Sequence, residues 1–245
     1  MTIQDINFTT TKIEIVETGN VIASATGFFF RHNEVKYLAT NRHVVIDEEK
    51  KYFPDSIRIT LHANRVDLTK NRNVDLSLYK DTTPLWLQHP NYKENMCDIA
   101  LIPLNKSTLQ GNNYDIFMSS SITFIGSEII NTRDIHSFGS VVIVGYPLGF
   151  HDEKHNLPVY RRATIASCYG INFNGLPYFL VDANLHQGTS GSPVVNTHHT
   201  LFKESDGQEG YAFFGVHSAE HVVGQDPLGL NVVWYASLIE EIASQ

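Results

Sequence analysis

The sequence is poor in cysteine and has no long hydrophobic run. Cys97 and Cys168 are the two cysteines in 245 residues, so a disulfide framework is excluded, although a single bridge is not. No apolar stretch approaches the roughly 18 residues that a membrane-spanning helix needs. Residues 1–5 lack the basic and apolar regions of a secretory signal. We therefore expect a cytoplasmic protein.

Positive charge is also scarce. The chain has 18 Lys and Arg residues against 26 Asp and Glu residues, which gives a formal net charge of −8 at pH 7. Its longest basic clusters are the pairs Lys50-Lys51 and Arg161-Arg162. Proteins that bind nucleic acids or anionic membranes gather basic residues on one face. We expect neither nucleic acid nor membrane as a partner of this chain.

Strand patterns dominate the sequence. Residues 57–61 alternate apolar and polar side chains, as a half-buried strand does. Other β-branched and aromatic runs cover residues 12–17, 21–30, 35–40, 99–104, 141–146, 164–168, 178–182 and 211–217. Residues 236–243 instead place Leu238, Ile239 and Ile242 at helical spacing. The pattern predicts an all-β barrel or sandwich that ends in a helix.

Three segments between the strands are predicted to be connections. Residues 105–137 are rich in Ser, Thr and Asn with weak periodicity, and we interpret them as a crossover between two halves of the chain. Residues 151–158 are polar, and residues 197–210 are charged. We expect residues 151–158 to form a mobile loop and residues 197–210 to form an exposed one.

Three motifs carry residue types suited to nucleophilic catalysis. They are residues 37–45 with His43, residues 97–101 with Asp98, and residues 188–195 with Ser190. Taken singly, each is an ordinary strand end or turn. Together they supply a base, an orienting acid and a nucleophile in the order His, Asp, Ser, which is the order of chymotrypsin-type enzymes. An α/β-hydrolase would need Gly two residues after the nucleophile, where this chain has Ser192.

These motifs resemble those of the trypsin-like (chymotrypsin-fold) serine peptidases, and among them the bacterial glutamyl endopeptidases and exfoliative toxins. The shared motifs are LATNRHVV, DIALIPL, VIVGYP, GTSGSPVV and GVHS, spread over residues 27–219. The resemblance implies two six-stranded antiparallel β-barrels with the active site in the cleft between them. Residues 1–120 would form the N-terminal barrel, and residues 121–245 would form the C-terminal barrel and end in a helix.

The resemblance implies a serine endopeptidase that cleaves protein or peptide substrates through an acyl-enzyme, without cofactor or metal. Ser190 would be the nucleophile and needs an adjacent base, because its hydroxyl is scarcely ionised at neutral pH. His43 would accept and return the proton, and Asp98 would orient the imidazole. The backbone N–H groups of Gly188 and Ser190 would form the oxyanion hole.

The resemblance also places the specificity pocket at Asn184, Leu185, His217 and Ser218. Cleavage after Lys or Arg needs a carboxylate six residues before the nucleophile, where this chain has Asn184, so a basic preference is disfavoured. His217 matches the histidine with which glutamyl endopeptidases meet an acidic side chain, but Leu185 replaces the companion hydroxyl. The prediction is a non-basic preference, for Glu or Gln or for apolar residues. A structural role of a buried His217 is the alternative.

Thr189 departs from the pattern of secreted relatives, which carry an Asp there that pairs with a newly cleaved N-terminus. Activation of that kind is not expected, so either the site is preformed or another event assembles it. We expect control by narrow specificity or by a protein regulator that orders residues 151–158 or 197–210. Two alternatives are a protease-fold binding module without turnover and a protease that processes only itself.

The remaining cysteine and histidine residues predict no second site. Cys97 and Cys168 are both interpreted as small buried hydrophobic residues. His217 and His221 form an H-x-x-x-H pair without an evident third ligand, and His198-His199 lie in a polar turn. We predict no metal site.

Overall fold

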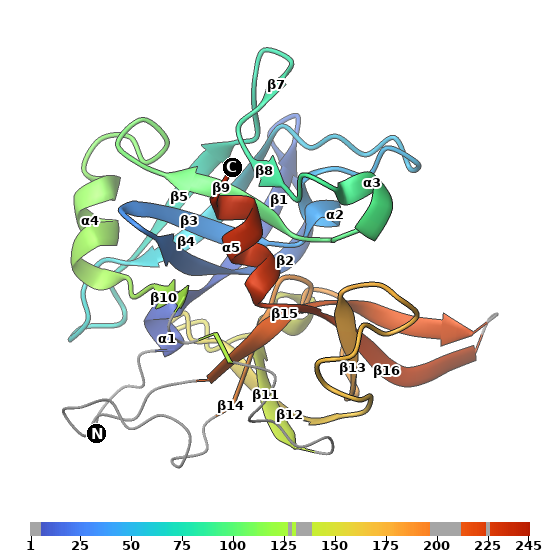
Figure 1. The fold of residues 1–245 in the computed structure, drawn as a ribbon. Coiled ribbons are helices and arrows are strands. Elements are labelled where there is room, and N and C mark those ends of the chain that lie inside the picture. Colours follow the sequence, from blue (N-terminus) through green and yellow to red (C-terminus); the bar gives the residue numbers. More distant parts are fainter. Residues whose placement is uncertain (1–5, 127–128, 131–138, 197–211, 224–225) are drawn as a thin grey trace.

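The protein is described by a computed structural model that covers residues 6–126, 129–130, 139–196, 212–223 and 226–245. Two β-structures follow one another along the chain, and they lie one above the other in Figure 1. The last helix of the chain returns to the N-terminal structure, so that both ends of the sequence contribute to it.

The N-terminal structure is an eight-stranded sheet. Its strands are β1 (Thr10–Glu17), β2 (Asn20–His32), β3 (Val35–Thr40), β4 (Ser56–His62), β5 (Asn71–Ser77), β8 (Leu87–Gln88), β9 (Ala100–Leu104) and β10 (Phe124–Ile125). They are hydrogen-bonded in the order β5-β4-β1-β2-β3-β9-β8, and β10 pairs in parallel with β2. A separate hairpin joins β6 (Tyr79–Lys80) to β7 (Thr83–Pro84).

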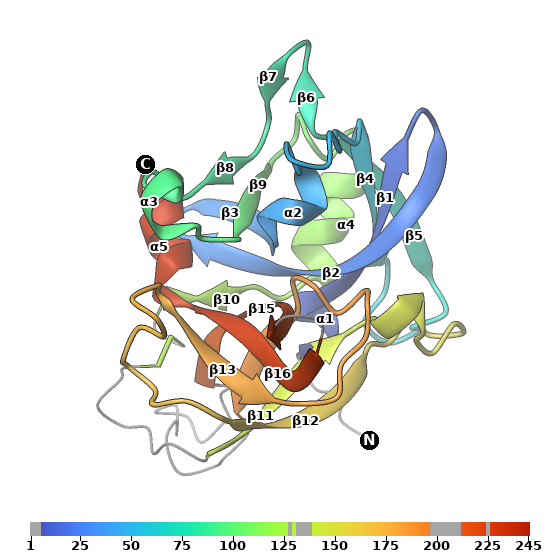
Figure 2. The ribbon, with the colours of Figure 1, turned by 90° about the vertical axis from the view of Figure 1, so that its right-hand side faces the viewer.

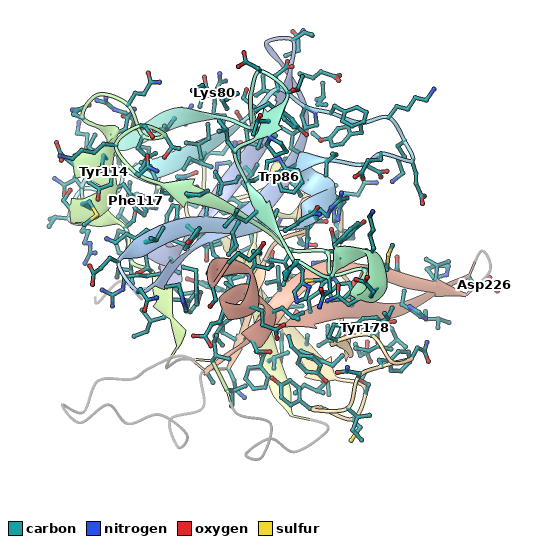
Figure 3. All side chains as sticks on the ribbon, turned by 45° about the horizontal axis from the view of Figure 1, so that its top comes forward. Lys80, Trp86, Tyr114, Phe117, Tyr178 and Asp226 are labelled. Carbon is teal, nitrogen blue, oxygen red and sulfur yellow. The ribbon has the colours of Figure 1, made fainter. Side chains whose placement is uncertain are left out.

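This sheet differs from the closed six-stranded barrel expected for the N-terminal half. Its two ends, β5 and β8, are not paired with each other, and β8 has two residues, too few for a ladder along the seven residues of β5. A helix, α4 (Asn113–Ser120), packs on β4 and covers the core instead. It places Phe117 against Phe29, with ring centroids 4.9 Å apart, and Figure 3 labels Phe117 on this helix.

The C-terminal structure is a closed antiparallel barrel of six strands, as predicted. Its strands are β11 (Ser140–Gly145), β12 (Val159–Ile165), β13 (Tyr178–Asp182), β14 (Pro193–Asn196), β15 (Ala212–Val223) and β16 (Asp226–Tyr235). The order around the barrel is β11-β12-β13-β16-β15-β14. The hairpin of β15 and β16 extends away from the body of the molecule, and Asp226 is labelled at its far end in Figure 3.

The helices are short. They are α1 (Ile6–Thr9), α2 (Arg42–Val45), α3 (Tyr92–Asn95), α4, α5 (Ser237–Ala243) and a 3-10 turn, η3 (Pro147–Gly149). The prediction for residues 236–243 is confirmed, because α5 buries Leu238, Ile239 and Ile242. No helix in the described part of the chain is long and apolar enough to cross a membrane.

Aromatic side chains pack the two structures together. Phe28 of β2, Phe124 of β10 and Phe213 of β15 belong to one hydrophobic cluster. The rings of Phe124 and Phe213 stack with centroids 4.8 Å apart, and Phe28 meets Phe213 edge-on at 5.3 Å. Figure 2 shows the same junction from the side, with β10 running between the two structures. Hydrogen bonds from Thr26 to Ser190 and from Ser218 to Asp98 also cross between the two structures.

Some loop and cysteine predictions need correction. Cys97 is buried as predicted, but Cys168 is exposed, because β12 ends at Ile165 and leaves it in a loop. The predicted crossover at 105–137 contains α4. An isolated antiparallel β-bridge between Asp152 and Leu157 closes the loop at residues 151–158. Residues 197–210 lie outside the described residues.

Candidate active site

His43 and Asp98 are joined by two hydrogen bonds, and a third binds the neighbouring Asn41 to Asp98. His43 follows directly on β3, in α2, where its backbone N–H donates to Asp98 Oδ1 at 2.8 Å. Its ring Nδ1 lies 2.6 Å from Asp98 Oδ2. The side-chain amide of Asn41 donates to the Asp98 carbonyl at 2.7 Å. Two segments 55 residues apart are thereby joined, and the carboxylate binds the Nδ1 edge of the imidazole.

Asp98 determines the protonation of the His43 ring. A carboxylate only accepts hydrogen bonds, so Nδ1 carries the proton and Nε2 presents its lone pair. Burial opposes the charged form of His43, but the Coulombic attraction and the hydrogen bond from Asp98 outweigh it, so the pKa of His43 lies above its ordinary value of 6.5. The imidazole is therefore a stronger base than a free histidine.

Ser190 lies in the turn between β13 and β14 and is connected to the same carboxylate through Ser218. The Ser190 hydroxyl donates to the Ser218 carbonyl at 3.1 Å, and the Ser218 hydroxyl donates to Asp98 Oδ2 at 2.6 Å. Ser218 is free to do this because the pairing of β15 with β16 is irregular between His217 and Glu220. Within the described residues, no hydrogen bond joins the Ser190 hydroxyl to the His43 ring.

Gly188 adopts a conformation that other residues avoid. Its φ is +90°, and an added Cβ would lie 2.6 Å from the Tyr146 carbonyl oxygen and 2.8 Å from the Leu148 nitrogen. The preceding carbonyl, of Gln187, accepts a hydrogen bond from the Leu148 N–H at 2.6 Å. Because the C=O and N–H of a trans peptide point in opposite directions, the Gly188 N–H is directed away from Leu148. The sequence predicted a role for Gly188, but it did not indicate the contact between Leu148 and Gln187.

Two threonines hold the turn that carries Ser190. Thr26 on β2 receives a hydrogen bond from the Tyr146 N–H, donates its hydroxyl to the Gly188 carbonyl at 2.8 Å, and donates its N–H to the Ser190 carbonyl at 2.9 Å. The Thr189 hydroxyl donates to the His186 carbonyl at 2.7 Å and closes the turn from within. The position that Asp occupies in secreted relatives thus makes a local contact here.

A pocket of about 210 Å³ opens beside Ser190. Leu185, His217 and Ser218, three of the four predicted pocket residues, line it together with Ser190. Asn184, the fourth, is exposed and does not line it, and its carbonyl accepts a hydrogen bond from the Arg161 guanidinium. The lining also includes His186 and Gln187, which directly precede Gly188, and Ala219, which follows Ser218. The structure adds three residues that the sequence did not indicate: Thr189, Glu220 and Asn231.

His217 is buried at the wall of this pocket. Its Nδ1 lies 2.9 Å from the Thr189 carbonyl oxygen and its Nε2 lies 3.3 Å from Asn231 Oδ1. Burial lowers the pKa of His217 more than these contacts raise it, so the imidazole is neutral at pH 7. His221 lies elsewhere, with its ring facing Phe173. No group of three metal-ligating side chains occurs among the described residues.

Arg42 is a buried residue of the site that the sequence did not indicate. Its guanidinium donates to both carboxylate oxygens of Glu48, to Gln88 at 2.7 Å and to the Tyr92 hydroxyl at 3.2 Å. It also lies 3.9 Å from the centre of the Tyr92 ring. Arg42 precedes His43, and Tyr92 belongs to α3, which leads to Asp98. Arg42 therefore ties the two segments that carry the pair.

Comparison with solved structures identifies the fold. The chain is similar to the Rv3671c protease of M. tuberculosis in its active form, with a TM-score of 0.51 and 16% identity over 97% of this chain and 80% of that one. It is also similar to the serine endoprotease from Yersinia pestis, with a TM-score of 0.55 and 16% identity over 97% of this chain and 62% of that one. The HtrA-type protease AlgW with tripeptide gives a TM-score of 0.56 and 16% identity over 97% of this chain and 60% of that one. The chain thus spans about three-fifths of the length of the last two proteins.

Comparison of sequences identifies the family. Curated proteins give no sequence match. Residues 25–202 match the family model of the trypsin-like peptidase domain, and this range contains His43, Asp98 and Ser190. The narrower resemblance to glutamyl endopeptidases stays a prediction. Because the matched range covers well over half of the sequence, the chain belongs to the trypsin-like peptidase domain family.

Proposed function

We propose that this protein is a serine endopeptidase that cleaves protein or peptide substrates with Ser190 as nucleophile, His43 as general base and Asp98 as the orienting acid. The observation that carries the proposal is the convergence on one carboxylate. Asp98 accepts hydrogen bonds from His43 and from Ser218, and Ser218 in turn accepts one from Ser190. Three motifs far apart in sequence are thereby gathered at one point.

The proposed reaction proceeds in two halves. Ser190 Oγ attacks the carbonyl carbon of the scissile amide while its proton passes to His43 Nε2, and the imidazolium is stabilised by Asp98. The tetrahedral intermediate then expels the amine, which takes the proton from Nε2, and an ester to Ser190 remains. Water, deprotonated by His43, attacks this ester and releases the acid and the free serine.

The negative charge on the attacked carbonyl oxygen needs donors that are already in place. We propose the backbone N–H groups of Gly188 and Ser190 for this role. Neither donates to an acceptor in the part of the chain that the structure describes, and the contact between Gln187 and Leu148 keeps the Gln187 carbonyl from filling the hole. Donors of this kind are worth about 10²–10³ in rate each. The available N–H groups and the position of the Gln187 carbonyl favour an oxyanion hole that is formed before substrate binds.

Substrate preference and control are further parts of the proposal. The sequence predicts a non-basic side chain, Glu or Gln or an apolar residue, for the pocket lined by Leu185 and His217, and the charges that line this pocket revise that prediction. Control is proposed to come from a protein regulator or from ordering of loops, and residues 151–158 border η3, which contacts the turn of Gly188. A reducing compartment such as the cytoplasm suits the two unpaired cysteines.

One observation favours a second function. The Ser190 hydroxyl donates to a carbonyl rather than to His43, as it would in a binding module without turnover. A serine-directed fluorophosphonate probe separates the two functions. It should label the wild type and not the Ser190→Ala variant. Ser192→Ala is the control and should still be labelled, because the Ser192 hydroxyl is buried and has no hydrogen-bond partner among the residues that the structure describes. Absence of labelling in the wild type would favour the binding module.

A peptide-library cleavage profile then tests the endopeptidase directly. The Ser190→Ala variant serves as the blank, and cleavage within peptides that persists in this blank would contradict the assignment of the nucleophile. Intact mass recorded over time distinguishes cleavage of added peptides from processing of the chain itself.

A further inference from the structure

The pocket beside Ser190 contains one carboxylate and no cation facing it from within the described residues. Glu220 of β15 lines the pocket, and its Oε1 accepts a hydrogen bond from the Gly229 N–H at 3.3 Å. The other carboxylate oxygen remains available to a ligand. The remaining titratable residues of the lining are His186, which is exposed, and His217, which is buried. The charge that a substrate side chain meets here is therefore negative.

His217 is not available to bind an acidic side chain. A neutral imidazole has one N–H, and both of its nitrogens already face oxygen atoms of the protein, Thr189 O and Asn231 Oδ1. The orientation of Asn231 is determined, because its amide nitrogen donates to the Ala183 carbonyl at 2.7 Å and to the Gly229 carbonyl at 3.3 Å. Its oxygen must then point at His217. Neither His217 nor Asn231 therefore has an N–H left for a substrate carboxylate.

The structure also removes the reason for excluding a basic side chain of the substrate from this pocket. That expectation depended on Asn184 forming the base of the pocket, and Asn184 does not line it. The apolar wall is Leu185, and the carboxylate of Glu220 stands at the same pocket. This arrangement fits a side chain with an apolar stem and an end that donates hydrogen bonds.

We propose that Glu220 determines the substrate side chain, and that the pocket accepts residues whose ends carry N–H donors, an amide or a cation, and rejects carboxylates. This proposal deepens the proposed function and rests on it. Glutamine and glutamate have the same shape, so the difference between them isolates the donor chemistry. A glutamine amide gives Glu220 a hydrogen bond, whereas a glutamate would bring two negative charges together. Hydrogen bonds to charged groups discriminate by about 10- to 100-fold.

Matched peptides that differ only at the residue before the scissile bond test this proposal. We expect kcat/KM of the wild type to be about 10- to 100-fold higher for Gln than for Glu, and a Lys peptide to be cleaved faster than a Glu peptide. In Glu220→Gln the ratio of Gln to Glu should fall to within a few-fold of one. Glu34→Gln removes the same charge from an exposed turn outside the pocket and should keep the wild-type ratio. The Lys and Gln peptides show whether cation or amide is preferred.

A second measurement separates failure of this proposal from failure of the proposed function. Binding of the same labelled peptides to Ser190→Ala protein, measured by fluorescence polarisation, reports the pocket without turnover. Ser190-dependent cleavage with equal rates for Gln and Glu overturns the role of Glu220 and leaves the endopeptidase standing. Absence of cleavage together with preferred binding of the Gln peptide overturns the endopeptidase and supports the pocket. A ratio that Glu220→Gln and Glu34→Gln change equally also overturns the proposal.

Discussion

The carbonyl oxygen of Gln187 accepts a hydrogen bond from the backbone N–H of Leu148 at 2.6 Å. Leu148 makes this contact from a left-handed conformation, with a φ of 53°, inside η3. The contact connects two loops of the C-terminal barrel and turns the N–H of Gly188 away from η3. A single backbone hydrogen bond thereby leaves the proposed oxyanion hole open before any substrate binds.

Replacing Gly188 by Ala should abolish this arrangement. The new Cβ would meet the Tyr146 carbonyl and the Leu148 nitrogen, so the peptide must rotate and withdraw its N–H. We expect kcat to fall by about 10²–10³. Gly175→Ala is the matched control, because Gly175 also has a positive φ, of +80°, but nothing within 4 Å of the added atom. Equal losses of kcat in the two variants would contradict a specific role of Gly188.

The pH dependence of activity should follow His43. The base must be neutral to accept the proton of Ser190, so kcat/KM should decline as the pH falls through the pKa of His43, which lies above 6.5. Asp98→Asn removes the charge and the acceptor that raise this pKa, so the midpoint should move to lower pH. The same variant should lose about 10⁴ in kcat. A pH–rate profile of both proteins checks this, and an unchanged midpoint in Asp98→Asn would argue against the pairing.

Arg42 should contribute both to stability and to activity. Arg42→Ala removes the contacts with Glu48, Gln88 and Tyr92 that tie the His43 segment to α3. We expect a loss of about 1–3 kcal/mol in the free energy of unfolding, together with a lower kcat at nearly unchanged KM. Arg42→Lys keeps the charge but neither the fork nor the stacking, so it should recover only part of both quantities.

Denaturant unfolding and kinetics of the two Arg42 variants check this expectation. Wild-type values of both quantities in Arg42→Ala would show that the contacts of Arg42 neither stabilise nor position the His43 segment.

The two cysteines should react differently with a thiol reagent. Cys168 is exposed and should be labelled in the native protein, whereas Cys97 is buried, and burial raises the pKa of the Cys97 thiol. One thiol should therefore titrate with Ellman's reagent before unfolding and a second one after it. Cys168→Ser should show no native reactivity. Rapid labelling of Cys97 in that variant would show that the segment before Asp98 opens in solution.

Much of the site could be predicted because its reactive side chains lie in short local motifs. His43, Asp98 and Ser190 each sit in a short segment of unusual composition beside a strand. The positions of other residues depended on contacts between distant segments. Arg42 could not be assigned a role from the sequence, because its partners Glu48 and Tyr92 come from different turns. Cys168 was predicted to be buried because its preceding residues resemble a strand, but the barrel ends β12 earlier.

The sequence alone determined the all-β class, the C-terminal helix and the order of the three residues proposed to be catalytic, because alternation of apolar residues and motif composition are local properties. Only the tertiary structure decided which side chains face the pocket. Asn184 lies outside it, while Glu220 and Asn231 enter it from an irregular stretch of the β15–β16 pairing. The physical reason is that strand register and bulges decide which way a side chain points, and they are set by the partner strand rather than by the residue's own neighbours.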